Sequence, residues 1–259
     1  MKSSNYPAFH RRIMSVWYRH MLVYTRNLFS NGLPPFLEPL IFLAGVGLGL
    51  GKYIVSMEGM PYIQFLASGL LVTSSMYTAA FECTYGTFIR LEFDKVYDGM
   101  LGAPITADDL IIGEILWAGS KGFFFSLAVL IIVFIFGVIP VGLSLLAPFI
   151  GFITGILFAT ISLLVTSFVK NINHFNFYMT GILSPMFFFS GVVFPVKSLP
   201  EFLRPFAEVM PLTHVVRLVR AFCNSAFDVH LFIDVAVILV MIWISGFFAI
   251  RRLKRLLIL

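Results

Sequence analysis

Four ionisable residues interrupt the long apolar runs of this chain, namely Glu38, Glu82, Glu114 and Lys121. Ionisable groups at membrane depth are costly, and they commonly serve ion coupling, proton transfer or substrate binding. Glu114 and Lys121 share a helix face but lie about 10 Å apart along the axis, so we expect no direct ion pair between them. Two roles fit the four residues. We favour positioning of a cytoplasmic gate at the helix ends over contact with a coupling ion or substrate.

Motifs for other chemistry are missing from the sequence. The glycine-rich segment that ends at Tyr53 lacks the phosphate-loop spacing, because Val46 stands where Gly is needed and Tyr53 where Ser or Thr is needed. The pairs Gly47/Gly51 and Gly151/Gly155 suit close helix packing instead. The five His and two Cys residues show no metal-ligand spacing. We therefore expect no catalytic residue, metal or bound cofactor in this chain, and no ATP hydrolysis by it.

The composition determines the broad class of protein. Hydrophobic residues make up 59% of the 259 residues and charged residues only 12%, about half the ~25% of soluble domains. A soluble globule of this size cannot hide so much apolar surface. The chain is therefore predicted to be an all-α integral membrane protein. The net charge of +5 comes from cations beside apolar runs, so it indicates membrane orientation and not nucleic-acid binding.

Uncharged runs of about 20 residues place the membrane spans, because a helix needs that length to cross the hydrocarbon core. Pro140 and Gly137 divide the longest run, and Thr106 with Asp109 resembles a capping box at the start of the third span. We predict one transmembrane domain, 1–259. Its six spans are 33–51, 60–81, 107–139, 143–169, 172–194 and about 231–250, with spans one to five inside 33–194 and a tail at 251–259.

The distribution of basic residues predicts the orientation. Twelve of the 18 Lys and Arg residues fall on the side of both termini if the N-terminus is inside, so both termini of this multi-pass chain are expected in the cytoplasm. The connection between the fifth and sixth spans departs from this bias, since it carries Lys197, Arg204, Arg217 and Arg220. We expect these side chains to reach the outer headgroups.

Three segments outside the spans have helical periodicity. Within 1–32, apolar residues at three- and four-residue steps from Phe9 to Leu28 predict a basic amphipathic helix at the membrane surface, with contact to a cytosolic partner as the alternative. In 84–104, an aromatic ridge with mixed charges predicts a helix that docks on another protein, with a solvated loop as the alternative. Four prolines divide 195–222 into two short apolar stretches, which predicts a re-entrant hairpin in the outer leaflet.

Two stretches carry a family resemblance, 189–200 (FSGVVFPVKSLP) and 210–214 (MPLTH). Through them the chain resembles the permease subunits of type-2 ATP-binding-cassette exporters, which include drug and polysaccharide exporters, and the resemblance implies a multi-pass chain in the bacterial inner membrane. The segments 62–69 (YIQFLASG) and 103–106 (APIT) are similar to the branch that exports nodulation lipo-oligosaccharides. The similarity extends over nearly the whole chain.

The resemblance implies a dimer of permeases, expected to be a homodimer, with two cytosolic ATPases that hold ATP and Mg²⁺, all surrounded by membrane lipids. The coupling helix would be 87–102, and it would contact the ATPase through Phe88, Leu91, Glu92, Asp94, Tyr97, Met100 and Leu101. The substrates would be amphiphiles. Spans two and five would line their pathway with Phe65, Tyr77, Phe177, Tyr178, Met186, Phe187 and Phe188.

Two alternatives from other classes stay open. An ion-coupled secondary transporter would commonly contain inverted repeats, and we see no half-to-half similarity. A membrane lipid or glycan transferase would need an acidic or histidine cluster at one face, for which Glu82, Glu92, Asp94 and Asp98 are the available residues. The cargo, and a heteromeric permease pair, also stay open.

Overall fold

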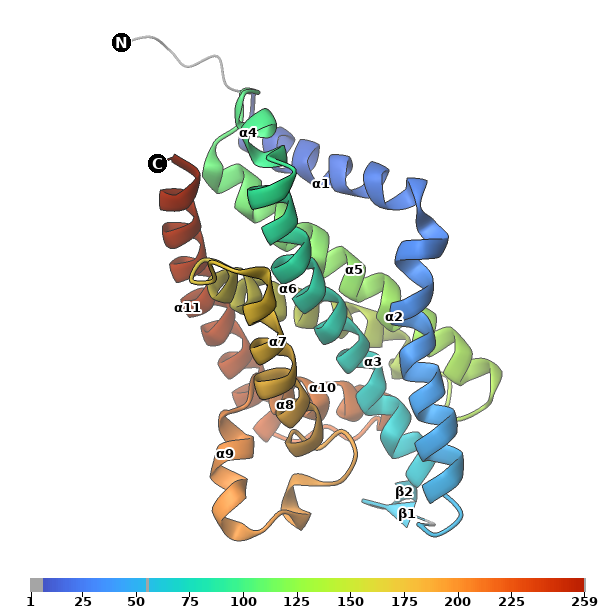
Figure 1. Ribbon diagram of the computed structural model, residues 1–259. Coiled ribbons are helices and arrows are strands. Elements are labelled where there is room, and N and C mark those ends of the chain that lie inside the picture. The colour runs from blue at the N-terminus through green and yellow to red at the C-terminus, as the bar shows by residue number, and fades with distance from the viewer. Residues whose placement is uncertain (1–6, 55, 259) are drawn as a thin grey trace.

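The computed structural model describes residues 7–54 and 56–258, and only the backbone of residues 30, 31, 34–36 and 38 within them. The predicted role of Glu38 therefore lies outside the described side chains. The described chain is almost entirely helical (Figure 1), which confirms the all-α membrane class. Its two ends lie at the same end of the bundle, beside α1 (Phe9–Arg26) and α4 (Val96–Leu101).

Three helices of the described chain are long and apolar enough to cross a membrane: Ala107–Ile135, Leu143–Thr166 and His230–Ile258. The first is α5, the second joins the 3₁₀ turn η4 (Leu143–Leu146) to α6 (Ala147–Thr166), and the third is α11. The helix α3 (Tyr62–Phe81), most of whose residues are buried, packs against both α5 and α6. The count of six spans stays a prediction.

The other predicted spans are less regular. The first falls on α2 (Leu28–Phe42) and the π-helical turn η1 (Leu43–Leu48), and the fifth is divided among several short elements. These are the 3₁₀ turn η5 (Ile172–His174), α7 (Phe175–Tyr178), the π-helical turn η6 (Met179–Leu183) and α8 (Ser184–Phe189). A small antiparallel hairpin, β1 (Ser56–Met57) and β2 (Met60–Pro61), precedes α3.

The segment predicted to be a re-entrant hairpin is folded into short helices, as its prolines indicated. It comprises the 3₁₀ turns η7 (Val196–Ser198) and η8 (Glu201–Leu203), α9 (Arg204–Val209) and α10 (Pro211–Asn224). It lies at the end of the bundle opposite the chain ends (Figure 1). The apolar face of α10 packs on α3 and α11, so its backbone lies within protein and not against lipid alone.

The predicted capping box begins α5. The Asp109 backbone N–H donates to Thr106 Oγ1 at 3.2 Å, and the Thr106 N–H donates to Asp109 Oδ2 at 2.8 Å. These bonds satisfy two donors that the first helical turn would otherwise leave open. The start of the third span was therefore predictable to the residue.

The N-terminal helix packs on α5 through part of its surface. Its residues Ile13, Val16 and His20 are buried against α5, and Trp17 Nε1 donates to Ser120 Oγ at 2.9 Å. Gly113 makes this approach possible, since a Cβ there would lie 2.6 Å from Val16 Cβ. Protein therefore covers Ile13 of the predicted apolar face, whereas Phe9 of the same face is 55% exposed. The location at the membrane surface stays a prediction.

Small residues bring α5 and α6 into backbone contact. A Cβ added at Gly155 would lie 2.8 Å from the Ala118 carbonyl oxygen, and one at Gly122 would lie 2.5 Å from the Gly151 carbonyl oxygen. Both distances are shorter than van der Waals contact, and the obstructing atoms belong to the backbone. The predicted packing role of the Gly151/Gly155 pair is confirmed.

Replacing Gly155 by Ala is expected to lower the free energy of unfolding by about 1–3 kcal/mol, because an added methyl group here forces the helices apart. Thermal unfolding of the purified protein in detergent measures the change. The matched control is Gly49→Ala, where no atom lies within 4 Å of the added Cβ. Equal unfolding temperatures for the two variants would contradict the backbone contact.

Candidate functional site

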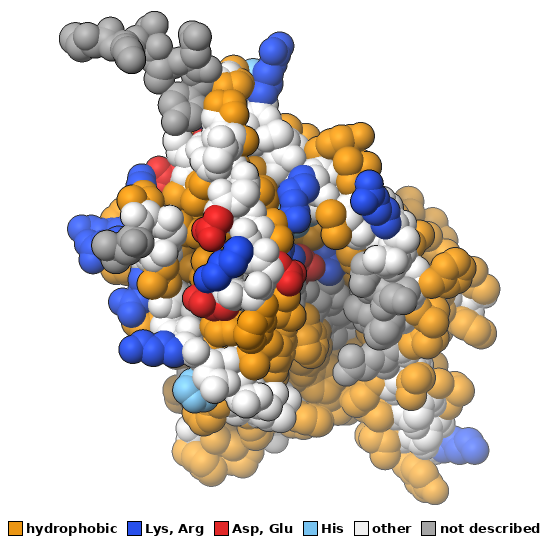
Figure 2. Space-filling model, turned by 45° about the horizontal axis from the view of Figure 1, so that its top comes forward, with side chains coloured by type: hydrophobic (Ala, Val, Ile, Leu, Met, Phe, Trp, Pro, Cys, Tyr) orange, Lys and Arg blue, Asp and Glu red, His pale blue; other side chains and the backbone are white. Residues whose placement is uncertain are grey.

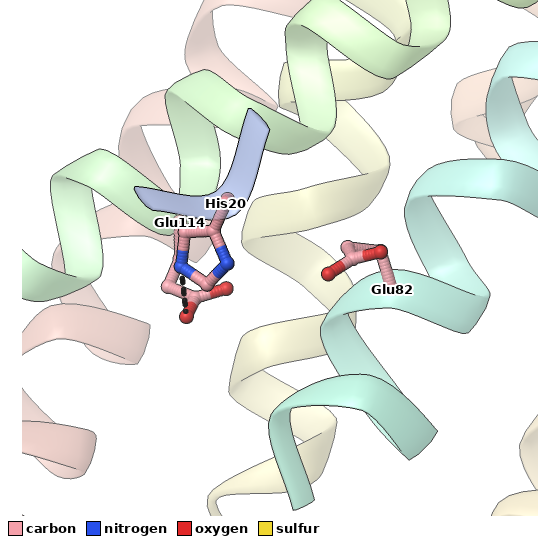
Figure 3. Close-up of side chains that lie close together, drawn as sticks. All are labelled: His20, Glu82 and Glu114. Atoms are coloured by element: carbon pink, nitrogen blue, oxygen red, sulfur yellow. Dashed lines mark ion pairs between the residues drawn. The ribbon is translucent and has the colours of Figure 1, made fainter. Parts of the chain in front are cut away.

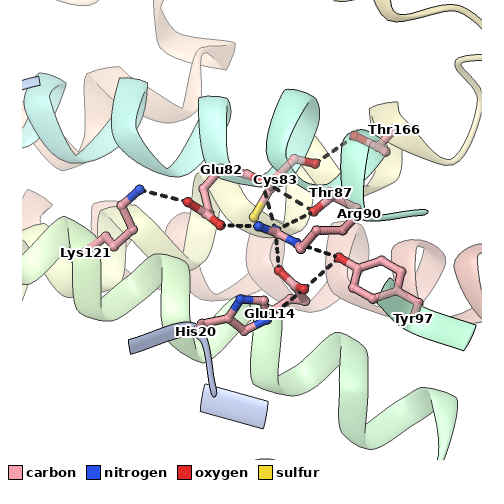
Figure 4. A network of polar contacts seen from close by, with 9 residues as sticks. All are labelled: His20, Glu82, Cys83, Thr87, Arg90, Tyr97, Glu114, Lys121 and Thr166. Atoms are coloured by element: carbon pink, nitrogen blue, oxygen red, sulfur yellow. Dashed lines mark hydrogen bonds and ion pairs between the residues drawn. The ribbon is translucent and has the colours of Figure 1, made fainter. Parts of the chain in front are cut away.

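A network of buried charged and polar side chains lies at the end of the bundle that holds the chain ends (Figure 4). Its two carboxylates are Glu82, in the π-helical turn η2 (Glu82–Gly86) that continues α3, and Glu114 on α5. The space-filling view shows charged side chains of both signs over this end (Figure 2). The network therefore joins helices that are far apart in the sequence.

Arg90 bridges the two carboxylates. It lies in the second π-helical turn, η3 (Ile89–Phe93), which continues the same helix. Its Nη1 lies 2.7 Å from Glu82 Oε1 and its Nη2 lies 2.8 Å from Glu114 Oε2. Lys121 Nζ lies 2.8 Å from the other Glu82 oxygen. The formal charges of these four side chains cancel, which limits the cost of burying them.

Tyr97 and His20 complete the contacts of Glu114. The Tyr97 hydroxyl donates to Glu114 Oε1 at 2.6 Å and accepts from Arg90 Nε at 3.3 Å. His20 Nε2 lies 2.9 Å from the same carboxylate oxygen (Figure 3). Burial raises the pKa of Tyr97, so this residue stays a neutral phenol that can donate. The contacts attach α4 and α1 to the middle of the network.

His20, Glu82 and Glu114 also hold potential ligand atoms within 4.8 Å of one another. The arrangement nevertheless suits ion pairs better than a metal. Both carboxylates already accept from Arg90, and Lys121 occupies a remaining oxygen of Glu82. A divalent cation would have to enter beside two fixed positive charges, which is electrostatically unfavourable. We therefore interpret the cluster as a structural ion-pair network.

The sequence predicted part of this network. Glu82, Glu114 and Lys121 were selected as ionisable groups near apolar runs, and the structure brings them together. Among the described residues no ion pair joins Glu114 directly to Lys121, as their spacing predicted. Arg90 and His20 were missed as members of the network, since neither has a local pattern that marks it.

The predicted coupling helix 87–102 is corrected. It is two elements, because Lys95 adopts a left-handed conformation with φ of 51°. The first part, through Phe93, continues the helix that begins at Tyr62, and the second part is α4. A helix cannot continue through such a residue, so the segment turns at Asp94 and Lys95.

The same segment does not expose the predicted aromatic ridge. Phe88 and Tyr97 are buried within the chain, whereas Leu91, Met100 and Leu101 are partly buried. Glu92 and Asp94 are exposed, as is Phe93, which was not selected. The periodicity of 84–104 identified a true apolar face, but that face packs inside the chain. The surface that this segment offers to another protein is the turn at Phe93, Asp94 and Lys95.

The residues predicted to line a substrate pathway divide into two groups. Phe65, Tyr178, Met186 and Phe187 are buried and Tyr77 is partly buried; Phe187, for example, contacts the Phe42 ring at a centroid distance of 5.2 Å. Phe177 and Phe188 are 75% and 45% exposed. Only these two of the seven therefore present a large surface outside the chain.

Comparison with known proteins identifies the family. The model of the ABC-2 type transporter family matches residues 11–224. The chain belongs to that family. It is 30% identical over 243 residues to nodulation protein J of Rhizobium meliloti, covering 93% of this chain and 92% of the relative. It is 34% identical over 215 residues to nodulation protein J of Rhizobium leguminosarum bv. viciae, covering 83% of each chain.

A third relative is the inner membrane transport permease YadH of Escherichia coli, 24% identical over 204 residues, with 79% of each chain covered. These findings confirm the resemblance drawn from the sequence. The chain is the permease subunit of an ABC-2 type transporter, a multi-pass membrane protein whose family membership implies an ATPase partner.

Replacing Arg90 by Gln is expected to lower the free energy of unfolding by about 3–5 kcal/mol, because two buried carboxylates then lose their shared cation. Thermal or denaturant unfolding in detergent measures this loss. Adding Glu114→Gln to the Arg90→Gln chain should recover part of it. The control is Lys95→Gln, whose 3.7 Å pair with Glu92 is solvent-exposed and is worth less than about 1 kcal/mol. A similar effect of both single substitutions would contradict the network.

Proposed function

We propose that this permease exports an amphiphile out of the cytoplasm across the bacterial inner membrane, in an assembly of two permease copies and two cytosolic ATPases. The cargo class, a lipo-oligosaccharide, glycolipid, polysaccharide or hydrophobic drug, is supported by the nodulation-protein relatives and by the exposed aromatic residues Phe177 and Phe188. ATP and Mg²⁺ belong to the partner ATPase in this proposal. Both chain ends lie in the cytoplasm.

The ATPase docks on the turn between η3 and α4. This turn exposes Phe93, which is 64% exposed, among the charged residues Glu92, Asp94, Lys95 and Asp98, which are exposed as well. An exposed aromatic residue within a charged rim is typical of a protein interface. The turn lies at the end of the bundle that holds the chain ends (Figure 1), where a cytosolic partner has access.

The buried network carries the proposal for coupling. Arg90 precedes the docking turn and Tyr97 follows it, and both side chains contact Glu114 on α5. A displacement of the turn therefore moves both attachments to α5, and through His20 it also reaches α1. ATP binding closes the ATPase pair, and it shifts the equilibrium between permease conformations only if the closed pair binds one conformation more tightly. Because the docking turn is rigidly attached to α3 and α5, these helices move with it.

The network also argues against the alternative functions. An ion-coupled transporter needs a carboxylate that can release its cation, whereas Glu82 and Glu114 each accept from fixed Arg or Lys side chains. The acidic cluster considered for a transferase is divided, because Glu82 faces this network while Glu92, Asp94 and Asp98 are exposed.

Reversing charge on the docking turn should remove the ATPase. We expect Asp94→Lys combined with Asp98→Lys to reduce ATPase recovery at least about tenfold, because like charges across an interface cost several kcal/mol. Affinity purification of the tagged permease with its ATPase, followed by intact-complex mass measurement, gives the stoichiometry, expected as two permeases and two ATPases. The control is Lys52→Glu, an exposed position before β1. Undiminished recovery from the double variant would refute the docking assignment.

Replacing Tyr97 by Phe should separate docking from coupling. The ring remains buried while the hydroxyl bond to Glu114 is lost, which is worth about 1–3 kcal/mol for a charged acceptor. We expect the ATPase to be recovered in full and transport of a fluorescent amphiphile by reconstituted vesicles to fall about fivefold. Tyr53→Phe, at an exposed position, serves as control. Full transport by the Tyr97→Phe protein would show that the hydroxyl bond does not couple the two subunits.

A further inference from the structure

A second concentration of charge lies at the opposite end of the bundle. A cavity of about 430 Å³ opens between the β-hairpin, the re-entrant hairpin and the first turns of α11. Its volume falls within the ~300–1,000 Å³ of pockets that hold small molecules. Both signs of charge line it, and the network described above uses none of these residues.

Some of the charged groups at this cavity already have protein partners. Arg217 forms ion pairs with Glu208 and Asp234, the latter at 3.4 Å. Asp234 also lies 2.6 Å from His214 Nδ1. Burial lowers the pKa of Arg217, but the bonds to Glu208 and Asp234 outweigh it and the pKa is raised. Arg217, Glu208 and Asp234 line the cavity, and their charges are already paired with one another.

Arg220 differs from Arg217, because no carboxylate compensates its charge at close range. Its side chain is 12% exposed, and the nearest carboxylate oxygen, Glu58 Oε2, lies 4.0 Å from Nη1. Nη2 donates to the carbonyl oxygens of Phe65 and Gly191 at 3.3 and 3.0 Å, and the guanidinium carbon lies 3.7 Å from the Phe65 ring centroid. Burial lowers the pKa of Arg220 to about 10, although Glu58 partly opposes this.

This arrangement corrects the expectation that Arg220 reaches the headgroups by extending outward. Arg220 instead lines the cavity from inside, and within the described chain its Nη1 makes no hydrogen bond. A cation held in this way favours an anionic oxygen from a ligand. Lys197 and Arg204 also line the cavity, and neither forms an ion pair with a described carboxylate.

The remaining acids supply the opposite charge. Asp228 and Glu58 line the same cavity and are exposed; Asp228 has no ion pair with a described residue, and Glu58 only the 4.0 Å approach to Arg220. The ligand therefore meets three cations and two carboxylates that the chain leaves incompletely paired. That complement suits a zwitterion with a phosphate and an ammonium group. Among the described residues the lining contains no Phe, Tyr or Trp. Since quaternary ammonium groups prefer aromatic cages, a primary ammonium fits better.

The surroundings indicate an amphiphilic ligand. Close in sequence to the lining residues Arg204, Glu208 and Leu231, five apolar side chains are more than half exposed: Phe202, Phe206, Val209, Phe232 and Ile233. The cavity also borders the start of α11, where a membrane-crossing helix meets the outer headgroups in the proposed orientation. Acyl chains would lie against this apolar surface while the polar group enters the cavity.

We propose that the cavity binds the headgroup of phosphatidylethanolamine from the outer leaflet, with the phosphate at Arg220, Lys197 and Arg204 and the ammonium at Asp228 and Glu58. The site uses the orientation of the chain but neither the ATPase nor the cargo. It can therefore be tested on the purified permease alone, and its failure would leave the export proposal unaffected.

Native mass spectrometry of the delipidated permease, titrated separately with dioleoyl phosphatidylethanolamine, phosphatidylcholine and phosphatidylglycerol, tests this site. We expect phosphatidylethanolamine to bind about tenfold more tightly than either of the others, the free-energy difference of one charge-assisted hydrogen bond. Equal binding of the three lipids would overturn the proposal. Preferred binding of phosphatidylglycerol would also overturn it, because it would show an anion site without ammonium recognition.

Variants at the exposed rim assign the two charges without disturbing the buried Arg220. Lys197→Gln should weaken phosphatidylethanolamine binding about tenfold, whereas Asp228→Asn should abolish the preference over phosphatidylglycerol. Lys52→Gln, an exposed position that does not line the cavity, is the matched control. Unchanged gel-filtration profiles and unfolding temperatures establish that the variants are folded. A loss of binding in Lys52→Gln equal to that in Lys197→Gln would refute the assignment.

Discussion

Arg90 holds two carboxylates that belong to different helices, and the arrangement of the end of the bundle where both chain ends lie depends on this contact. Without the guanidinium, Glu82 and Glu114 would repel each other in a medium that screens charge poorly. With it, the extension of α3 is fixed to α5, and Tyr97 and His20 attach α4 and α1 to the same carboxylate. A docking turn that would otherwise be a surface loop thereby becomes part of the bundle.

The two ends of the molecule use similar residues in different ways. At the end that holds the chain ends, the Arg90 charge is met by two carboxylates at hydrogen-bond distance. At the opposite end, the Arg220 guanidinium contacts carbonyl oxygens and the Phe65 ring, and its nearest carboxylate is 4.0 Å away. Complete pairing suits a rigid connection, whereas incomplete pairing leaves electrostatic attraction for a ligand. Burial of an arginine therefore does not by itself distinguish the two roles.

Much of the architecture could be predicted from local patterns. Continuous apolar runs predicted the helices, Thr106 and Asp109 predicted the start of α5, and the prolines between 195 and 211 predicted the re-entrant hairpin. What covers an apolar face could not be predicted, because periodicity defines a face and not its neighbour. Tyr97 and Ile13 illustrate this: both lie on correctly identified faces, and both pack within the chain. The partners of Glu82 and Glu114 come from four elements, and such an assembly has no signal in any single segment.

The helix that begins at Tyr62 continues without a break through Glu82 to Phe93, by way of two π-helical turns. Each residue added to such a helix rotates everything beyond it by about 100°. One insertion between Glu82 and Arg90 would therefore aim the guanidinium away from both carboxylates and swing the docking turn to another side of the bundle. The length of this stretch is consequently as strongly constrained as its side chains. The exposed turn at Asp94 and Lys95, by contrast, is where this part of the chain can change in length.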